Sequence, residues 1–154
     1  MSIFKKLIDF LNLFEKPEAL PSPNTWLAPN AVSVAVNLVT IDTSKLIRSL
    51  SRPPKVWAVA IPPTGSMDNT FDAGTSNILI AGSTPEDHEI LVSNLKEGDI
   101  AVYQRDTGFL IIHRIVKIEG ETYWFKGDNN PIQDSPVLKK DILWIWVANI
   151  SVLI

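Results

Sequence analysis

The chain has 154 residues, no cysteine and a formal net charge of −3 at pH 7. This length fits one domain with a hydrophobic core of its own. The absence of cysteine excludes disulfides, thiol catalysis and thiolate metal sites, and the negative net charge argues against a nucleic-acid partner. His88 lies in a polar segment with no second histidine nearby, so we expect no metal site, and we expect no cofactor.

The first 23 residues differ in character from the rest of the chain. Apolar side chains recur at helical spacing over residues 3–15, and three prolines follow before residue 24. We expect an amphipathic helix with a proline-rich linker over 1–23 and one domain over 24–154. Packing against the domain or a second copy of the chain is the simpler role for the helix. A peripheral membrane contact through its lysines is the alternative.

No run reaches the roughly 18 consecutive apolar residues that a membrane-spanning helix needs. Acidic and amide side chains interrupt the N-terminal apolar segment, and no small-residue cleavage site follows it, so it does not read as a signal peptide. We expect a protein that is either soluble in the cytoplasm or peripheral at a membrane surface.

Short β-branched and aromatic segments separated by glycine and proline predict a mainly β domain. In chain order, the expected strands are 31–41, 56–61, 76–81, 100–104, 110–118, 122–126 and 142–153. A short helix or turn is expected at 44–50. The polar segment 82–94 is expected to be a surface loop.

The expected strand at 56–61 leads into a Pro-Pro-Thr-Gly turn that ends at Ser66. Such a bend exposes the serine hydroxyl and allows its backbone N–H to face a developing oxyanion, with the Thr64 hydroxyl as a second donor. Serine is a weak nucleophile without a base, and it is also common in turns for conformational reasons alone. Ser66 is therefore a candidate nucleophile only in combination with other residues.

His113 is the candidate base. On a strand it shares a face with Ile111 and Ile115, and a half-buried imidazole suits general-base catalysis near neutral pH. A buried histidine that is hydrogen-bonded to a backbone carbonyl gives the same pattern. The strand pattern leaves both interpretations open.

Two acids follow the expected strand at 122–126. Turn formation accounts for Gly127, Asp128 and the asparagines after it, but it does not require the second acid, Asp134. Either Asp128 or Asp134 can accept the second imidazole N–H, so both are candidates for the orienting acid.

Four motifs in this order resemble the signature boxes of the type I signal peptidase family: Gly65-Ser66-Met67, Gly98-Asp99-Ile100, His113-Arg114-Ile115-Val116 and Lys126-Gly127-Asp128-Asn129-Asn130 with Asp134. The resemblance is closest to the branch in which histidine replaces the general-base lysine. It covers about residues 56–150.

The resemblance implies Ser66 as nucleophile, His113 as general base and Asp134 or Asp128 as orienting acid, with Thr64 as an oxyanion-hole hydroxyl. It also implies a coiled β-sheet shared with the LexA-type self-cleaving repressors. The implied partner is a peptide or protein substrate that binds as an added strand and is cut after small residues. The chain departs from the family at Met67-Asp68-Asn69, where Met-Glu-Pro is usual. Members of that branch carry a membrane-spanning anchor, and we expect none here.

The sequence therefore predicts a serine endopeptidase. A binding or assembly module that keeps the same fold without turnover is the alternative. If residues 77–81 form the edge of the cleft, Ile78 and Ile80 line shallow pockets for small or apolar substrate residues.

Overall fold

The structure is a computed structural model of the whole chain. It describes residues 32–35, 38–41, 50–68, 70–71 and 75–150. The expected helix and linker at 1–23 lie outside the described residues, as does nearly all of the expected helix or turn at 44–50.

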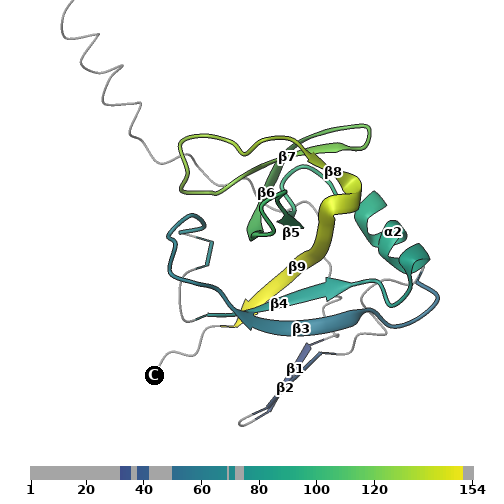
Figure 1. Cartoon of the computed structure of the whole chain (residues 1–154). Helices are drawn as coiled ribbons and strands as arrows, with labels where there is room; N and C mark the ends of the chain where they lie inside the picture. The colour runs from purple at the N-terminus through teal and green to yellow at the C-terminus, as the bar shows by residue number, and fades with distance from the viewer. Residues whose placement is uncertain (1–31, 36–37, 42–49, 69, 72–74, 151–154) are drawn as a thin grey trace, which may run out of the picture.

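A curled antiparallel sheet forms the body of the protein, in the strand order β3-β4-β9-β5-β6-β7-β8 (Figure 1). Its strands are β3 (Lys55–Ala60), β4 (Ser76–Ala81), β5 (Ile100–Gln104), β6 (Leu110–Glu119), β7 (Thr122–Lys126), β8 (Val137–Leu138) and β9 (Ile142–Ile150). The prediction of a mainly β protein is confirmed. The expected strands from 56 to 126 agree with the observed ones to within one residue. The expected strand at 142–153 is observed over its first nine residues, and residues 151–153 lie outside the described part of the chain.

The expected single strand at 31–41 is wrong. The structure has two strands there, β1 (Val32–Ala35) and β2 (Leu38–Ile41), which pair with each other as a separate antiparallel sheet. Val32 lies opposite Ile41, so the chain doubles back and the two short strands satisfy each other's backbone hydrogen bonds. The β-branched composition indicates strand but carries no sign of this reversal.

The expected surface loop at 82–94 is also wrong, because residues Pro85–Ser93 form helix α2. The Thr84 side chain caps the helix by accepting a hydrogen bond from the backbone N–H of Asp87 at 3.1 Å. Pro85 occupies the first turn, where its missing N–H costs nothing. A short 3-10 helix, η2 (Lys139–Asp141), precedes β9.

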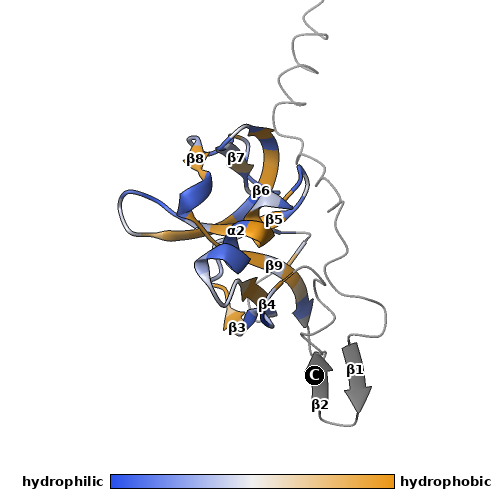
Figure 2. Ribbon diagram, turned by 90° about the vertical axis from the view of Figure 1, so that its right-hand side faces the viewer, coloured by the Kyte–Doolittle hydropathy of each residue, from blue (hydrophilic) through white to orange (hydrophobic). Residues whose placement is uncertain are grey.

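The main hydrophobic core lies inside the curl of the sheet. Within it, the rings of Tyr103 and Phe125 contact each other at a tilt, with their centroids 4.6 Å apart. Helix α2 adds Leu91 and Val92, which are almost fully buried. Figure 2 shows hydrophobic residues along β6 and β9 and a hydrophilic outer surface on α2. None of the described helices is long and apolar enough to span a bilayer.

The pairing of β6 changes along its length. Residues Leu110–Arg114 pair with β5, whereas pairing with β7 begins only at Arg114. The segment 110–113 therefore has a ladder partner on one side only. β9 lies between β4 and β5 and joins the two halves of the sheet.

Candidate active site

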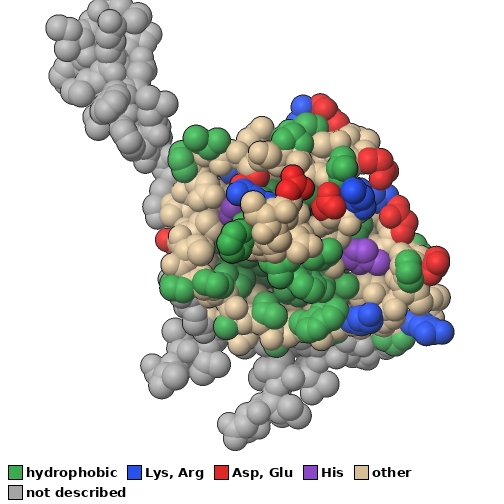
Figure 3. All heavy atoms as spheres, in the orientation of Figure 1, with side chains coloured by type: hydrophobic (Ala, Val, Ile, Leu, Met, Phe, Trp, Pro, Cys, Tyr) green, Lys and Arg blue, Asp and Glu red, His purple; other side chains and the backbone are tan. Residues whose placement is uncertain are grey.

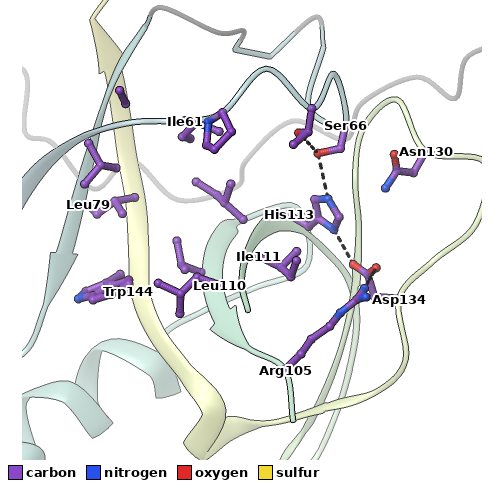
Figure 4. Close-up of a pocket in the computed structure, with 16 residues that line it drawn as sticks. Ile61, Ser66, Leu79, Arg105, Leu110, Ile111, His113, Asn130, Asp134 and Trp144 are labelled. Carbon is purple, nitrogen blue, oxygen red and sulfur yellow. Dashed lines mark hydrogen bonds and ion pairs between the residues drawn. The ribbon is translucent and has the colours of Figure 1, made fainter. Parts of the chain in front are cut away.

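Ser66, His113 and Asp134 form a continuous line of hydrogen bonds (Figure 4). His113 Nε2 is 3.1 Å from Ser66 Oγ, and His113 Nδ1 is 2.5 Å from Asp134 Oδ2. A carboxylate at Nδ1 favours the tautomer that carries its proton there. Nε2 is then the acceptor for the serine hydroxyl proton.

The turn that carries Ser66 is held by backbone contacts. The N–H of Thr64 donates to the carbonyl of Pro62 at 2.7 Å, and Gly65 has a φ of +69°. This left-handed conformation suits glycine because glycine lacks a Cβ. The chain thus leaves the end of β3 in a sharp bend that presents Ser66.

The loop after β7 holds the Ser66 turn in place through hydrogen bonds. Asn129 donates its backbone N–H to the carbonyl of Ser66 at 2.9 Å and its side-chain amide to the carbonyl of Gly65 at 2.8 Å. Gly127 lies so close that an added Cβ would be 2.6 Å from the Ser66 carbonyl oxygen. The same loop continues to Asp134, so one segment positions both the serine and the acid.

The surroundings of the Ser66 hydroxyl suit an oxyanion hole. Thr64 Oγ1 is 3.3 Å from Ser66 Oγ. Within the described part of the chain, the backbone N–H of Ser66 has no hydrogen-bond acceptor. Both groups are therefore available as donors to an oxygen atom placed beside Ser66.

The other candidate acid, Asp128, does not contact His113. It forms a two-pronged ion pair with Arg114, in which Nε and Nη2 each donate to one carboxylate oxygen at 2.8 Å. Arg114 also donates to the carbonyl of Gly98 at 2.7 Å, and Thr70 donates to Asp128. His113 and Arg114 are consecutive on β6 and point to opposite faces. Asp134 contacts His113 on one face of the strand, and Asp128 contacts Arg114 on the other.

Asp134 is held in its ionised form. Burial raises the pKa of its carboxyl, but the hydrogen bond and charge of His113 outweigh this effect, with smaller contributions from Tyr103 and Arg105. The pKa therefore lies below its ordinary value of 3.8. Arg105 Nη2 donates to Asp134 Oδ1 at 2.6 Å, a contact that no motif in the sequence indicates.

A cleft of about 640 Å³ opens beside Ser66. Its walls are mostly apolar and come from β3, β4, β5, β6 and β9, and its polar residues are grouped at the end with Ser66 and His113. Figure 3 shows hydrophobic side chains gathered in the hollow in the middle of this face. The main apolar lining residues are Val59, Ile61, Leu79, Val102, Leu110, Ile112 and Trp144.

The expectation that Ile78 and Ile80 line this cleft is wrong. Strand β4 is not an edge strand, since it pairs with both β3 and β9. Ile78 and Ile80 are buried, and Ile80 belongs to the core inside the curl. Leu79, which points to the opposite face of the strand, is the residue of this segment that lines the cleft.

His88 has a structural role. Its Nε2 is 2.9 Å from the carbonyl oxygen of Ile142, and the backbone N–H of Gly82 is 3.4 Å from its Nδ1. The described residues contain no group of three or more histidine, cysteine or acidic side chains arranged to hold a metal ion.

Comparison with protein-family models, curated proteins and solved structures returned no match. A functional assignment therefore depends on the site geometry and on the motifs in the sequence.

Proposed function

We propose that this protein is a serine endopeptidase of the type I signal peptidase kind. Ser66 is the nucleophile, His113 the general base and Asp134 the acid that orients the imidazole. The observation that carries this proposal is the unbroken line from Ser66 Oγ through both imidazole nitrogens to Asp134 Oδ2. That line ends in a cleft large enough for a peptide.

In the proposed reaction, Ser66 Oγ attacks the carbonyl carbon of the substrate while His113 Nε2 takes the hydroxyl proton. The oxyanion of the tetrahedral intermediate accepts hydrogen bonds from the Ser66 N–H and the Thr64 hydroxyl. Collapse of the intermediate breaks the C–N bond, and the imidazolium gives its proton to the leaving amine. His113 then activates a water that hydrolyses the acyl-enzyme and regenerates the Ser66 hydroxyl.

The substrate binds in this scheme as an extended strand along residues 110–113. These residues lack a ladder partner on the β7 side and line the cleft. An added strand there places alternate side chains against the apolar walls. The curled antiparallel sheet is compatible with the coiled sheet of the proposed family.

The residue at the cut is small in this proposal. A second recess next to Ser66 has a volume of only about 10 Å³ and is bounded by Ile61, Met67 and Phe71 among others. Such a recess has no room for a bulky side chain. Larger apolar side chains of the substrate are accommodated by the main cleft.

The test is labelling with a serine-reactive fluorophosphonate from pH 5 to pH 9, together with cleavage of a peptide library. We expect labelling of Ser66 only, rising with pH because only a neutral imidazole can accept the serine proton. Ser66→Ala and His113→Ala are each expected to abolish labelling and cleavage. Ser93→Ala, which changes an exposed serine on α2, is the matched control.

Turnover that persists in both Ser66→Ala and His113→Ala would contradict the proposal. Thermal unfolding of each variant checks that the fold is kept. A folded parent protein that neither reacts nor cleaves, but still binds apolar peptides, would indicate the binding module instead.

A further inference from the structure

Two different partners hold the two carboxylate oxygens of Asp134. Oδ2 is 2.5 Å from His113 Nδ1, and Oδ1 accepts from Arg105 Nη2 at 2.6 Å (Figure 4). The Asp134 side chain is 8% exposed, whereas that of Arg105 is 47% exposed. The ion pair thus joins a buried carboxylate to a guanidinium at the rim of the cleft.

The backbone around Arg105 is well fixed. Arg105 directly follows β5 and opens a tight turn, in which its N–H donates to the carbonyl of Phe109 at 3.0 Å and the Gly108 N–H donates to its carbonyl at 2.7 Å. Strand β5 also pairs with β6, where Ala101 lies opposite His113. One hairpin therefore positions both partners of Asp134.

Among the described residues, Arg105 is the side chain that donates a well-formed hydrogen bond to Oδ1 of Asp134. The Tyr103 hydroxyl from β5 lies close to the same carboxylate and contributes to lowering its pKa, but no contact of this hydroxyl has hydrogen-bond geometry among the described residues. Arg105 is therefore the main donor that holds the second oxygen of Asp134.

We propose that Arg105 is a positioning residue of the active site, which fixes the Asp134 carboxylate so that Oδ2 faces His113. The proposal rests on the function proposed above. Arg105 acts in two ways: its N–H groups restrict rotation of the carboxylate, and its positive charge contributes to the lowered pKa of Asp134. The charged or titratable groups that face Asp134 are His113 from β6, Tyr103 from β5 and Arg105 directly after β5.

Two substitutions separate these actions. Arg105→Gln keeps a donor but removes the charge, and Arg105→Lys keeps the charge but loses the planar donor arrangement. For Gln we expect the pKa of the Asp134 carboxyl to rise, because the Arg105 guanidinium contributes to lowering it. For Lys we expect little shift.

We expect kcat to fall about tenfold in both variants and by about 10- to 100-fold in Arg105→Ala, with a smaller change in KM. Misorientation of Asp134 impairs the proton transfer more than it impairs peptide binding. Lys117→Gln is the matched control, because Lys117 has a similarly exposed side chain, at 52%, paired with Glu119 on the same strand. The Lys117→Gln variant should leave both kcat and the titration of Asp134 unchanged.

A measurement that needs no turnover separates this proposal from the peptidase assignment. NMR of isotope-labelled carboxyl groups can follow the titration midpoint of Asp134 in the parent protein and in each variant. We expect an upward shift of the midpoint in Arg105→Gln and no shift in Lys117→Gln.

An unchanged Asp134 titration in Arg105→Gln would overturn the proposal, as would full kcat in Arg105→Ala. A parent protein without turnover whose Asp134 titration still responds to Arg105 would refute the peptidase function. That outcome would support the Arg105 contact itself.

Discussion

Strand β6 carries two neighbouring basic residues, each paired with an acid. His113 pairs with Asp134 on one face of the strand, and Arg114 pairs with Asp128 on the other. All four side chains are at least nine-tenths buried. The Arg114 pair is closed, because the carbonyl of Gly98 and the Thr70 hydroxyl complete its hydrogen bonds. The His113 pair is open, because Nε2 continues to a serine hydroxyl at the cleft.

The difference shows that residue type alone does not separate a catalytic pair from a structural one. Both acids come from the same loop, and both bases are neighbours on the same strand. The face of the strand decides which pair reaches the cleft.

The largest effect is expected on the open side. Asp134→Asn should lower kcat by about 10³- to 10⁴-fold, because an amide favours the wrong imidazole tautomer. The fold should persist, with only a modest fall in the melting temperature from the lost carboxylate contacts. Activity within tenfold of the parent protein would assign the orienting role elsewhere.

The closed side should respond through stability. Asp128→Ala leaves the Arg114 guanidinium buried without its carboxylate, and we expect the free energy of unfolding to fall by about 3–5 kcal/mol. Denaturant unfolding measures this change. The double variant Arg114→Met/Asp128→Leu should recover much of the loss, because no buried charge remains. A single variant as stable as the parent would show that the pair is not structural.

The loop that joins the two sides is tested at Gly127. Gly127→Ala would place a Cβ 2.6 Å from the Ser66 carbonyl oxygen, so we expect a loss of about 1–3 kcal/mol and a lower kcat through displacement of Ser66. Gly120→Ala is the control: its Cβ would meet no atom within 4 Å, but its φ is +58°. It should lose stability without losing activity.

The lowered pKa of Asp134 predicts an effect in acid. The folded protein binds this proton less readily than the unfolded chain, so the contribution to stability is present above about pH 4 and is lost as the pH falls through the folded pKa. The stability difference between the parent and Asp134→Asn should be constant above pH 4 and shrink below it. Parallel acid-unfolding curves would contradict this.

The smallest effect is expected at Tyr103. Its hydroxyl is buried without a hydrogen-bond partner among the described residues, and burial raises its pKa well above the usual value. Tyr103→Phe keeps the ring contact with Phe125 and should change stability by no more than about 1 kcal/mol, in the stabilising direction. A clear destabilisation would reveal a partner for the hydroxyl.

Much of the sheet could be predicted because strand signals are local. The alternation and the flanking glycines locate β4, β5 and β7 with their observed bounds. Helix α2 was missed although its start carries a recognisable signal, a Thr84 cap followed by Pro85 and two acids. Its amphipathic pattern is weak, which is why the polar composition predicted a loop.

The site motifs predicted which residues are present but not how all of them meet. The strand pattern predicted that His113 and Arg114 face opposite ways, yet either acid remained possible, because the path of the loop 127–134 depends on tertiary contacts. Leu79 lines the cleft instead of Ile78 because β4 has a partner on both sides. Arg105 had no sequence signal, because its contact with Asp134 joins the turn after β5 to the loop after β7, and only the tertiary fold brings these two segments together.

The position of β9 bears on how the protein is made. It is the last described strand in the chain, yet it lies between β4 and β5. During synthesis, the strands near Ser66 and the strand that carries His113 therefore leave the ribosome before β9, the strand that joins the two halves of the sheet. Such long-range pairing closes late in folding. On the proposed function, the growing chain cannot cut its neighbours until its own synthesis has passed β9.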